Sequence, residues 1–159
     1  MKKIRWLSIF LLITSWSCTT LHGGELKTVT FRSVPTPELW AMGDKPAYLV
    51  ITEKNWPTYF SNQPKGSDFK TNIYIAASLG MKPNPGHSVK ILQIQQEREK
   101  VVVRLEIGEP DPKKFYAQVI VYPRALAEVP TMNLQPFRSL TFVFLDQKGR
   151  ELASIRAEI

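Results

Sequence analysis

The sequence predicts an all-β fold: a small antiparallel β-sandwich or barrel of seven to eight strands with one short helix. Apolar and polar residues alternate at period two in several segments after residue 70, which is typical of half-buried strands. Glycine, proline and charged turn residues separate these segments at short intervals. Strands do not alternate regularly with long helical segments, so a parallel βαβ architecture is not expected.

The N-terminus has the layout of a secretory signal peptide over residues 1–17. Lys2, Lys3 and Arg5 precede an apolar stretch at residues 6–13, and small and polar residues follow it. This stretch is far shorter than the ~20 residues of a membrane-spanning helix. We therefore expect an exported protein of the cell envelope, in the periplasm or at the outer surface.

Cys18 is the only cysteine, and it directly follows the signal segment. Its position resembles that of the lipid-acceptor cysteine of bacterial lipoproteins, although Trp16 departs from the small residues preferred there. A lipid on Cys18 would anchor the protein to a membrane without spanning it. The alternative is ordinary cleavage that removes the cysteine. We expect a tether at residues 18–25 and a single β-rich domain at residues 26–159.

The first half of this domain is expected to contain two strands and a loop. Alternation over residues 26–33 predicts a half-buried strand, and the apolar run 47–51 predicts a buried one. Between them, three prolines and a glycine at residues 35–46 predict a loop. Trp40 and Met42 are expected to hold that loop against the core.

Residues 55–60 form the predicted helix. Asn55 can cap it, and Pro57 is tolerated in a first turn because its missing N–H has no intrahelical partner there. The aromatic residues Trp56, Tyr59 and Phe60 then share one face. We expect this aromatic face to be buried against a sheet.

After residue 70 the sequence predicts one strand after another. These strands are expected at residues 72–79, 88–95, 101–107, 115–123, 138–145 and 151–159. Their inward-facing residues are expected to include Ile73, Ile75, Ala77, Leu79, Val101, Val103, Leu105, Ile107, Leu140, Phe142 and Phe144. In the strand at 88–95 the apolar side changes at Ile91–Leu92, which predicts a β-bulge.

The sequence lacks the residue sets of common catalytic and metal sites. His22 and His87 are the only histidines, too few with one cysteine for a zinc cluster. The carboxylate pairs, Glu97 with Glu99 and Glu109 with Asp111, fall in polar turns. No G-x-S-x-G motif and no phosphate-binding glycine loop is present. We predict a protein that is not an enzyme, with no catalytic residue, no metal and no cofactor.

The charge balance does not favour nucleic acid as a partner. The net charge is +7 over the whole chain. Part of it belongs to the basic residues of the signal segment, so the mature chain is only mildly basic. A nucleic-acid-binding domain carries a denser positive surface.

The stretch "GMKPNPGHSV" at residues 80–89 contains the candidate binding loop. Pro85 and Gly86 fit the centre of a type II turn, because proline presets one φ angle and glycine takes the positive φ of the next position. A stiff loop loses little conformational entropy on binding. The predicted partner-binding residues are Lys82, Pro83, Asn84, Pro85, Gly86 and His87. A turn that only joins two strands is the alternative interpretation.

The segment "IYIAASLGMKPNPGHSVKILQIQQEREKVVVRLEIGEPDP", followed by "QVIVYPRALAEVP", resembles the PrcB-like domain of secreted bacterial proteins. The matching positions are Gly80, Pro83, Gly86, Ser88, Val89, Glu109, Pro110, Pro123 and Pro130. The likeness covers about residues 47–145. His87 stands where the family usually has tyrosine, and "NPG" replaces "TGG".

The family takes its name from an accessory lipoprotein of a surface protease complex. The resemblance therefore implies a non-enzymatic role in binding or stabilising another envelope protein, with a protease complex among the candidates. Two alternatives remain open. The stretch "KPNPGH" is also similar to the loop of chagasin-type cysteine protease inhibitors. Trp40, Trp56 and nearby tyrosines would suit a small-molecule or glycan binder.

Overall fold

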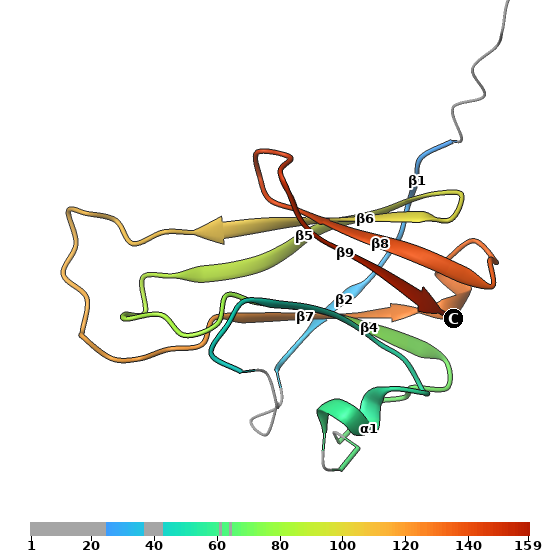
Figure 1. The fold of residues 1–159 in the computed structure, drawn as a ribbon, viewed down its shortest axis with the longest axis horizontal. Coiled ribbons are helices and arrows are strands. Elements are labelled where there is room, and N and C mark those ends of the chain that lie inside the picture. Colours follow the sequence, from blue (N-terminus) through green and yellow to red (C-terminus); the bar gives the residue numbers. More distant parts are fainter. Residues whose placement is uncertain (1–24, 37–42, 61, 64) are drawn as a thin grey trace, which may run out of the picture.

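Two facing β-sheets make up the part of the chain that the structure describes. The computed structural model describes residues 25–36, 43–60, 62–63 and 65–159. One sheet has five strands in the order β1-β5-β6-β8-β9, and the other has four in the order β2-β7-β4-β3 (Figure 1). The predicted all-β sandwich is therefore confirmed.

The strands are short and mostly antiparallel. The five-stranded sheet contains β1 (Lys27–Thr28), β5 (Ser88–Glu97), β6 (Lys100–Gly108), β8 (Ser139–Leu145) and β9 (Glu151–Glu158). The four-stranded sheet contains β2 (Arg32–Val34), β3 (Ala47–Ile51), β4 (Asn72–Ser78) and β7 (Arg124–Pro130). The helices are α1 (Trp56–Tyr59) and a 3₁₀ turn at Thr131–Asn133. The β6–β8 pair is parallel, which the sequence analysis did not predict.

The main core lies between the sheets, and the alternation of the strands determines it. The predicted inward residues of β4, β6 and β8 all belong to this core or pack against it. Phe142, Phe144 and Leu105 are fully buried. The predicted bulge is also present, because the β5–β6 register shifts between Ile91 and Gln93.

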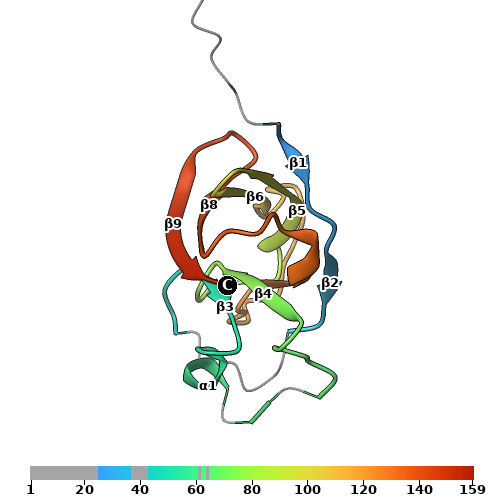
Figure 2. The same cartoon turned by 90° about the vertical axis from the view of Figure 1, so that its right-hand side faces the viewer.

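The predicted strand at 26–33 is divided between the sheets. Lys27 and Thr28 pair with β5, whereas Arg32 to Val34 pair with β7. Between them Val29 is buried, and its N–H donates to the carbonyl of Ile94 at 2.9 Å. Figure 2 shows β1 and β2 one above the other along the same side of the sandwich.

The aromatic face of the helix packs against the four-stranded sheet, as predicted, although Trp56 and Tyr59 are only half-buried. Phe60 and Phe69 are buried in a second apolar cluster, and Trp56 stacks on Phe69 with 5.5 Å between ring centroids. The proposed cap is only partly correct. Asn55 occupies the N-cap position, but its side chain bonds to Thr52 N–H and the Val50 carbonyl rather than to the helix.

The predicted strand at 115–123 is wrong. Residues 109–123 form a long connection without a regular strand, and β7 begins at Arg124. The pairing slot beside β4 is occupied by residues 124–130, whose Ala127 and Val129 enter the core. Residues 115–123 therefore form no strand despite their high β-propensity, because a strand also needs a partner strand and a buried face.

The hairpin between β8 and β9 carries a buried carboxylate. Asp146 is 1% exposed and accepts bonds from the Lys148 and Arg150 backbone N–H groups and from Arg150 Nε, all at 2.7–2.9 Å. Burial alone would raise the pKa of Asp146, but these hydrogen bonds outweigh it and hold the pKa below its usual value.

This depressed pKa predicts an acid-sensitive contribution to stability. The contribution of Asp146 is complete above the unfolded-state pKa of about 3.9 and is lost as the pH falls through the lower folded-state pKa. We expect Asp146→Asn to unfold at lower urea concentration than wild type at pH 7. The difference should shrink below about pH 4. Exposed Glu151→Gln is the control, and an Asp146→Asn deficit that stays constant with pH would contradict this explanation.

Several predicted features lie outside the described residues: the signal segment 1–17, Cys18, most of the tether, Trp40 and Met42. Within the described part of the chain, no helix has the length and apolarity needed to cross a membrane.

Candidate functional site

The predicted binding loop lies at one end of the sandwich, beside the long β6–β7 connection. Residues 79–87 join β4 to β5, and residues 109–123 join β6 to β7. We call these two segments together the loop end; they lie on the left in Figure 1. Lys82 and Val121 exchange backbone hydrogen bonds at 2.9 and 3.0 Å, which ties the two segments to each other.

The turn within residues 82–87 differs from the prediction. Among the described glycines only Gly66, Gly80 and Gly149 have positive φ, so Gly86 cannot occupy a type II turn. Instead, the Gly86 N–H donates to Asn84 Oδ1 at 3.0 Å, a local turn typical of asparagine.

Close packing explains why residue 86 is glycine. A Cβ atom there would lie 2.8 Å from both Pro110 Cβ and Tyr116 Cε1. The loop therefore rests directly on the β6–β7 connection. This tertiary contact restricts the loop in addition to its prolines.

The predicted binding residues differ in exposure. Pro83 and Pro85 are exposed, whereas Lys82, Asn84 and Gly86 are half-buried. The His87 side chain is 13% exposed, and Glu109 Oε2 lies 3.3 Å from its Nδ1. That contact lacks the alignment of a hydrogen bond. Of the six predicted residues, the two prolines thus offer the most accessible surface to a partner.

The most exposed apolar side chains of the loop end were missed by the sequence analysis. Phe115 is completely exposed, and Val119, Ile120, Tyr122 and Met81 are 40–60% exposed. The signal was present, because residues 115–122 carry no charge, glycine or proline. Because we predicted a strand there, we expected these side chains to lie in a sheet and not at the exposed surface.

The β6–β7 connection is fastened to the body at several points besides Val121. The Tyr122 hydroxyl donates to Asp44 Oδ1 at 3.1 Å, and Pro110 and Tyr116 pack closely on Gly86. Within the connection itself, the Asp111 N–H donates to the Tyr116 hydroxyl at 3.1 Å. The hydrogen bond to Asp44, together with its negative charge, raises the pKa of Tyr122. The Arg124 guanidinium lies 5.4 Å from the Tyr122 ring centroid. The connection is therefore attached to neighbouring segments at Tyr116, Val121 and Tyr122.

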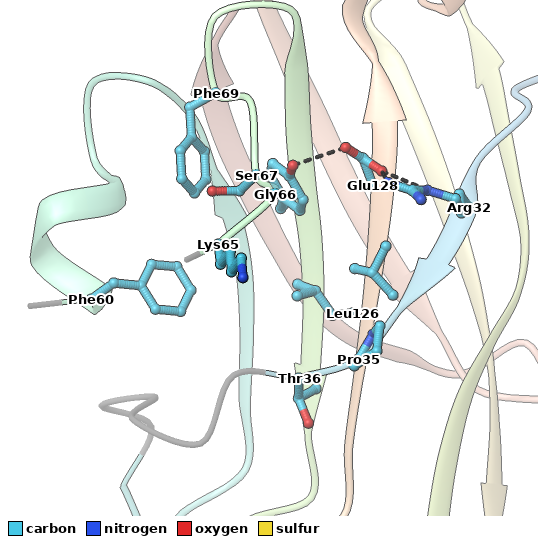
Figure 3. Close-up of a pocket in the computed structure, with 12 residues that line it drawn as sticks. Arg32, Pro35, Thr36, Phe60, Lys65, Gly66, Ser67, Phe69, Leu126 and Glu128 are labelled. Atoms are coloured by element: carbon cyan, nitrogen blue, oxygen red, sulfur yellow. Dashed lines mark hydrogen bonds and ion pairs between the residues drawn. The ribbon is translucent and has the colours of Figure 1, made fainter. Parts of the chain in front are cut away.

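A pocket of about 510 Å³ lies on the outer side of the four-stranded sheet. Phe60, Phe69 and Leu126 supply apolar walls, and the cationic side chains Arg32 and Lys65 also line the pocket (Figure 3). Trp56 stacks on Phe69 but is not among the residues that line the pocket. The suggested small-molecule or glycan binder, which relied on Trp40 and Trp56, stays a prediction.

The buried carboxylate of this pocket already has partners. Glu128 accepts hydrogen bonds from Arg32, from Asn72 Nδ2 at 3.1 Å and from the Tyr74 hydroxyl at 2.9 Å. Burial and the neighbouring Glu128 raise the pKa of Tyr74 to about 12. Both carboxylate oxygens are committed to protein donors, so the network supports the outer face of the sheet.

Acidic and imidazole side chains do not gather into a metal centre within the described ranges. No group of three or more His, Cys, Asp or Glu residues lies close enough together to hold an ion there. Glu109 contacts His87, and Asp111 caps its own turn by accepting from the Lys113 N–H.

Comparison with protein families identifies the segment that contains the loop end. Residues 73–130 match the family described as PrcB C-terminal. This match confirms the resemblance to PrcB-like domains, and it lies within the predicted range of residues 47–145. No curated protein and no solved structure matches the chain significantly.

The PrcB C-terminal match extends from β4 to β7 and contains both segments of the loop end. It includes the central strand pair β4–β7 and the β5–β6 hairpin. Strands β8 and β9, which complete the five-stranded sheet, lie after it. The part of the chain that resembles the family is thus the part that carries the candidate binding surface.

Proposed function

We propose that this chain is a non-enzymatic protein of the cell envelope that binds and stabilises another protein through its loop end. The PrcB-like resemblance makes a protease complex the first partner to test. The observation that carries the proposal is the fastened β6–β7 connection, which presents Phe115, Val119, Ile120 and Tyr122 to solvent.

Exposed apolar side chains favour a partner for a thermodynamic reason. Removing apolar surface from water contributes roughly 25 cal/mol per Å². Contiguous exposed apolar surface on a soluble domain is typical of interaction sites. Because the connection is already ordered by Val121, Tyr116 and Tyr122, binding would cost little further conformational entropy.

The predicted loop at residues 82–87 is part of the same proposed surface. Pro83 and Pro85 are exposed and lie next to the β6–β7 connection. Continuing the antiparallel register from the Lys82–Val121 bridge sets Met81 opposite Tyr122 and Pro83 opposite Ile120. Residues directly opposite each other present their side chains on the same side, so the two segments would offer one apolar surface.

Export and anchoring in this proposal are supported by residues 1–18 alone. Incorporation of labelled fatty acid by the wild type but not by Cys18→Ser is the expected result. Equal incorporation by both proteins, or none by the wild type, would rule out lipidation at Cys18.

Capture of envelope proteins tests the binding role. We expect Phe115→Ser combined with Ile120→Ser to reduce recovery of the bound protein at least roughly tenfold, because exposed aromatic anchors often dominate binding energy. The matched control is Met132→Ser, since Met132 is 86% exposed but lies after β7, at the other end of the sandwich. Circular dichroism should show all variants folded. Undiminished recovery with the double variant would contradict the proposal.

A further inference from the structure

The loop end and the N-terminal attachment lie at opposite ends of the sandwich. Strand β1, which follows the tether, pairs with Gln95 and Gln96 at the end of β5. The loop end lies at the opposite end of β5, just before Ser88. A strand of 10 residues extends about 33 Å at ~3.3 Å per residue. Figure 1 shows β1 and the β6–β7 connection at opposite ends.

This arrangement disfavours a membrane as the occupant of the loop end. A lipid on Cys18 would leave the nine residues 18–26 to bridge the bilayer surface and β1, and nine residues reach at most about 32 Å when fully extended. For the loop end to touch the same bilayer, residues 18–26 would have to be fully extended along the whole length of the domain. The loop end is therefore presented away from the membrane.

The charges beside the apolar surface favour an acidic partner. Three carboxylates lie in or beside the loop end: Asp111 forms an ion pair with Lys114, whereas Glu109 contacts His87 and Asp44 accepts a hydrogen bond from the Tyr122 hydroxyl. Lys45, Lys82 and Lys113 have no carboxylate within ion-pair distance among the described residues. These three lysines outnumber the two carboxylates without a lysine partner, Asp44 and Glu109, so the border of the loop end, which we call the rim, carries a small positive excess.

The same rim disfavours a second copy of this chain. In a symmetric dimer each patch would meet its own equivalent, so the two opposing rims would carry the same positive excess. Like charges facing each other across an interface are repulsive. Charge complementarity instead requires carboxylates on the opposing surface.

We propose that the loop end binds an apolar surface bordered by Asp or Glu side chains on a different protein, at a site held away from the anchoring membrane. This inference rests on the proposed function and specifies its partner. The apolar centre supplies the contact, and the lysine rim steers association and selects the acidic surface.

Photocrosslinking in cells tests this inference with the full chain. A benzophenone amino acid replaces Phe115 or, separately, Ile120, with Met132 as the control position. We expect one adduct with a different protein from the first two positions and none from the third. An adduct between two copies of this chain, or no protein adduct, would overturn both this inference and the proposed function.

Charge reversal separates the inference from the proposed function. Lys45→Glu combined with Lys113→Glu should reduce the adduct roughly tenfold, since both exposed lysines would then repel an acidic rim. Lys70→Glu combined with Lys100→Glu, at the other end of the sandwich, should leave it unchanged. If the adduct forms equally well with Lys45→Glu combined with Lys113→Glu, the proposed function stands but the acidic partner is wrong.

Vesicle flotation tests whether the loop end binds a membrane instead of a protein. Purified Cys18→Ser protein should not float with vesicles of equal parts phosphatidylglycerol and phosphatidylcholine at 150 mM salt, near physiological ionic strength. Flotation that is lost with Phe115→Ser would assign the loop end to a membrane and overturn the inference.

Discussion

Gly80→Ala is expected to lower the free energy of unfolding by roughly 2–4 kcal/mol, because backbone strain and overpacking act together. Gly80 has a φ of +69°, and an added Cβ would lie 2.3 Å from the Asp44 carbonyl oxygen. That oxygen accepts a hydrogen bond from the Met81 N–H at 2.8 Å. Neither backbone segment can move away without breaking this contact. Urea unfolding followed by fluorescence measures the effect.

Gly149→Ala is the matched control for this prediction. Gly149 has a similar φ of +78° but nothing within 4 Å of its added Cβ. Gly149→Ala should lower the free energy of unfolding by only about 1–2 kcal/mol, because a residue with a Cβ atom is strained in the left-handed region. Equal losses for the two variants would mean that the contact with Asp44 contributes nothing. Because Gly80 precedes the binding loop, its variant should also weaken partner recovery.

Phe142→Ala should lower the free energy of unfolding by about 3–5 kcal/mol, the usual cost of removing a buried aromatic ring from a packed core. Phe142 is fully buried between the sheets and belongs to β8. The neighbouring strands pair on both sides of β8, so the cavity cannot close by movement of an edge. Thermal and urea unfolding both measure this loss.

Phe115→Ala serves as the comparison with the same chemical change. Phe115 is fully exposed, so its truncation should alter stability by no more than about 0.5 kcal/mol. The same variant should reduce partner recovery, whereas Phe142→Ala should act on recovery only through unfolding. A large stability loss for Phe115→Ala would show that this ring packs on the domain in solution, which would remove the basis of the proposed surface.

The core and most strands could be predicted because each strand presents one face to a single apolar layer. In β6 the alternation of Val101, Val103 and Leu105 with Arg104 and Glu106 is reproduced in their burial. The bulge in β5 was predictable for the same reason, since an extra residue moves the apolar side chains to the other face. Period-two alternation along the strands is therefore enough to predict the sandwich fold.

The loop end could not be predicted in the same way, because its features depend on contacts between distant segments. Gly86 suggested a turn with positive φ, but Pro110 and Tyr116 determine its conformation by close packing. Residues 115–123 have strong β-propensity, yet β7 occupies the pairing position beside β4. The inhibitor alternative, which relied on a projecting "KPNPGH" loop, stays a prediction.

The sequence by itself determined the fold class, the core residues of β4, β6 and β8, and the position of the bulge, because alternation along one strand is local information. Only the tertiary structure decided that an uncharged, aromatic segment is left at the surface and that His87 turns toward Glu109. It also decided that β1 and the loop end lie at opposite ends of the sandwich. These outcomes depend on which strands compete for the same partner, and that competition is settled across the whole sheet rather than within any one segment.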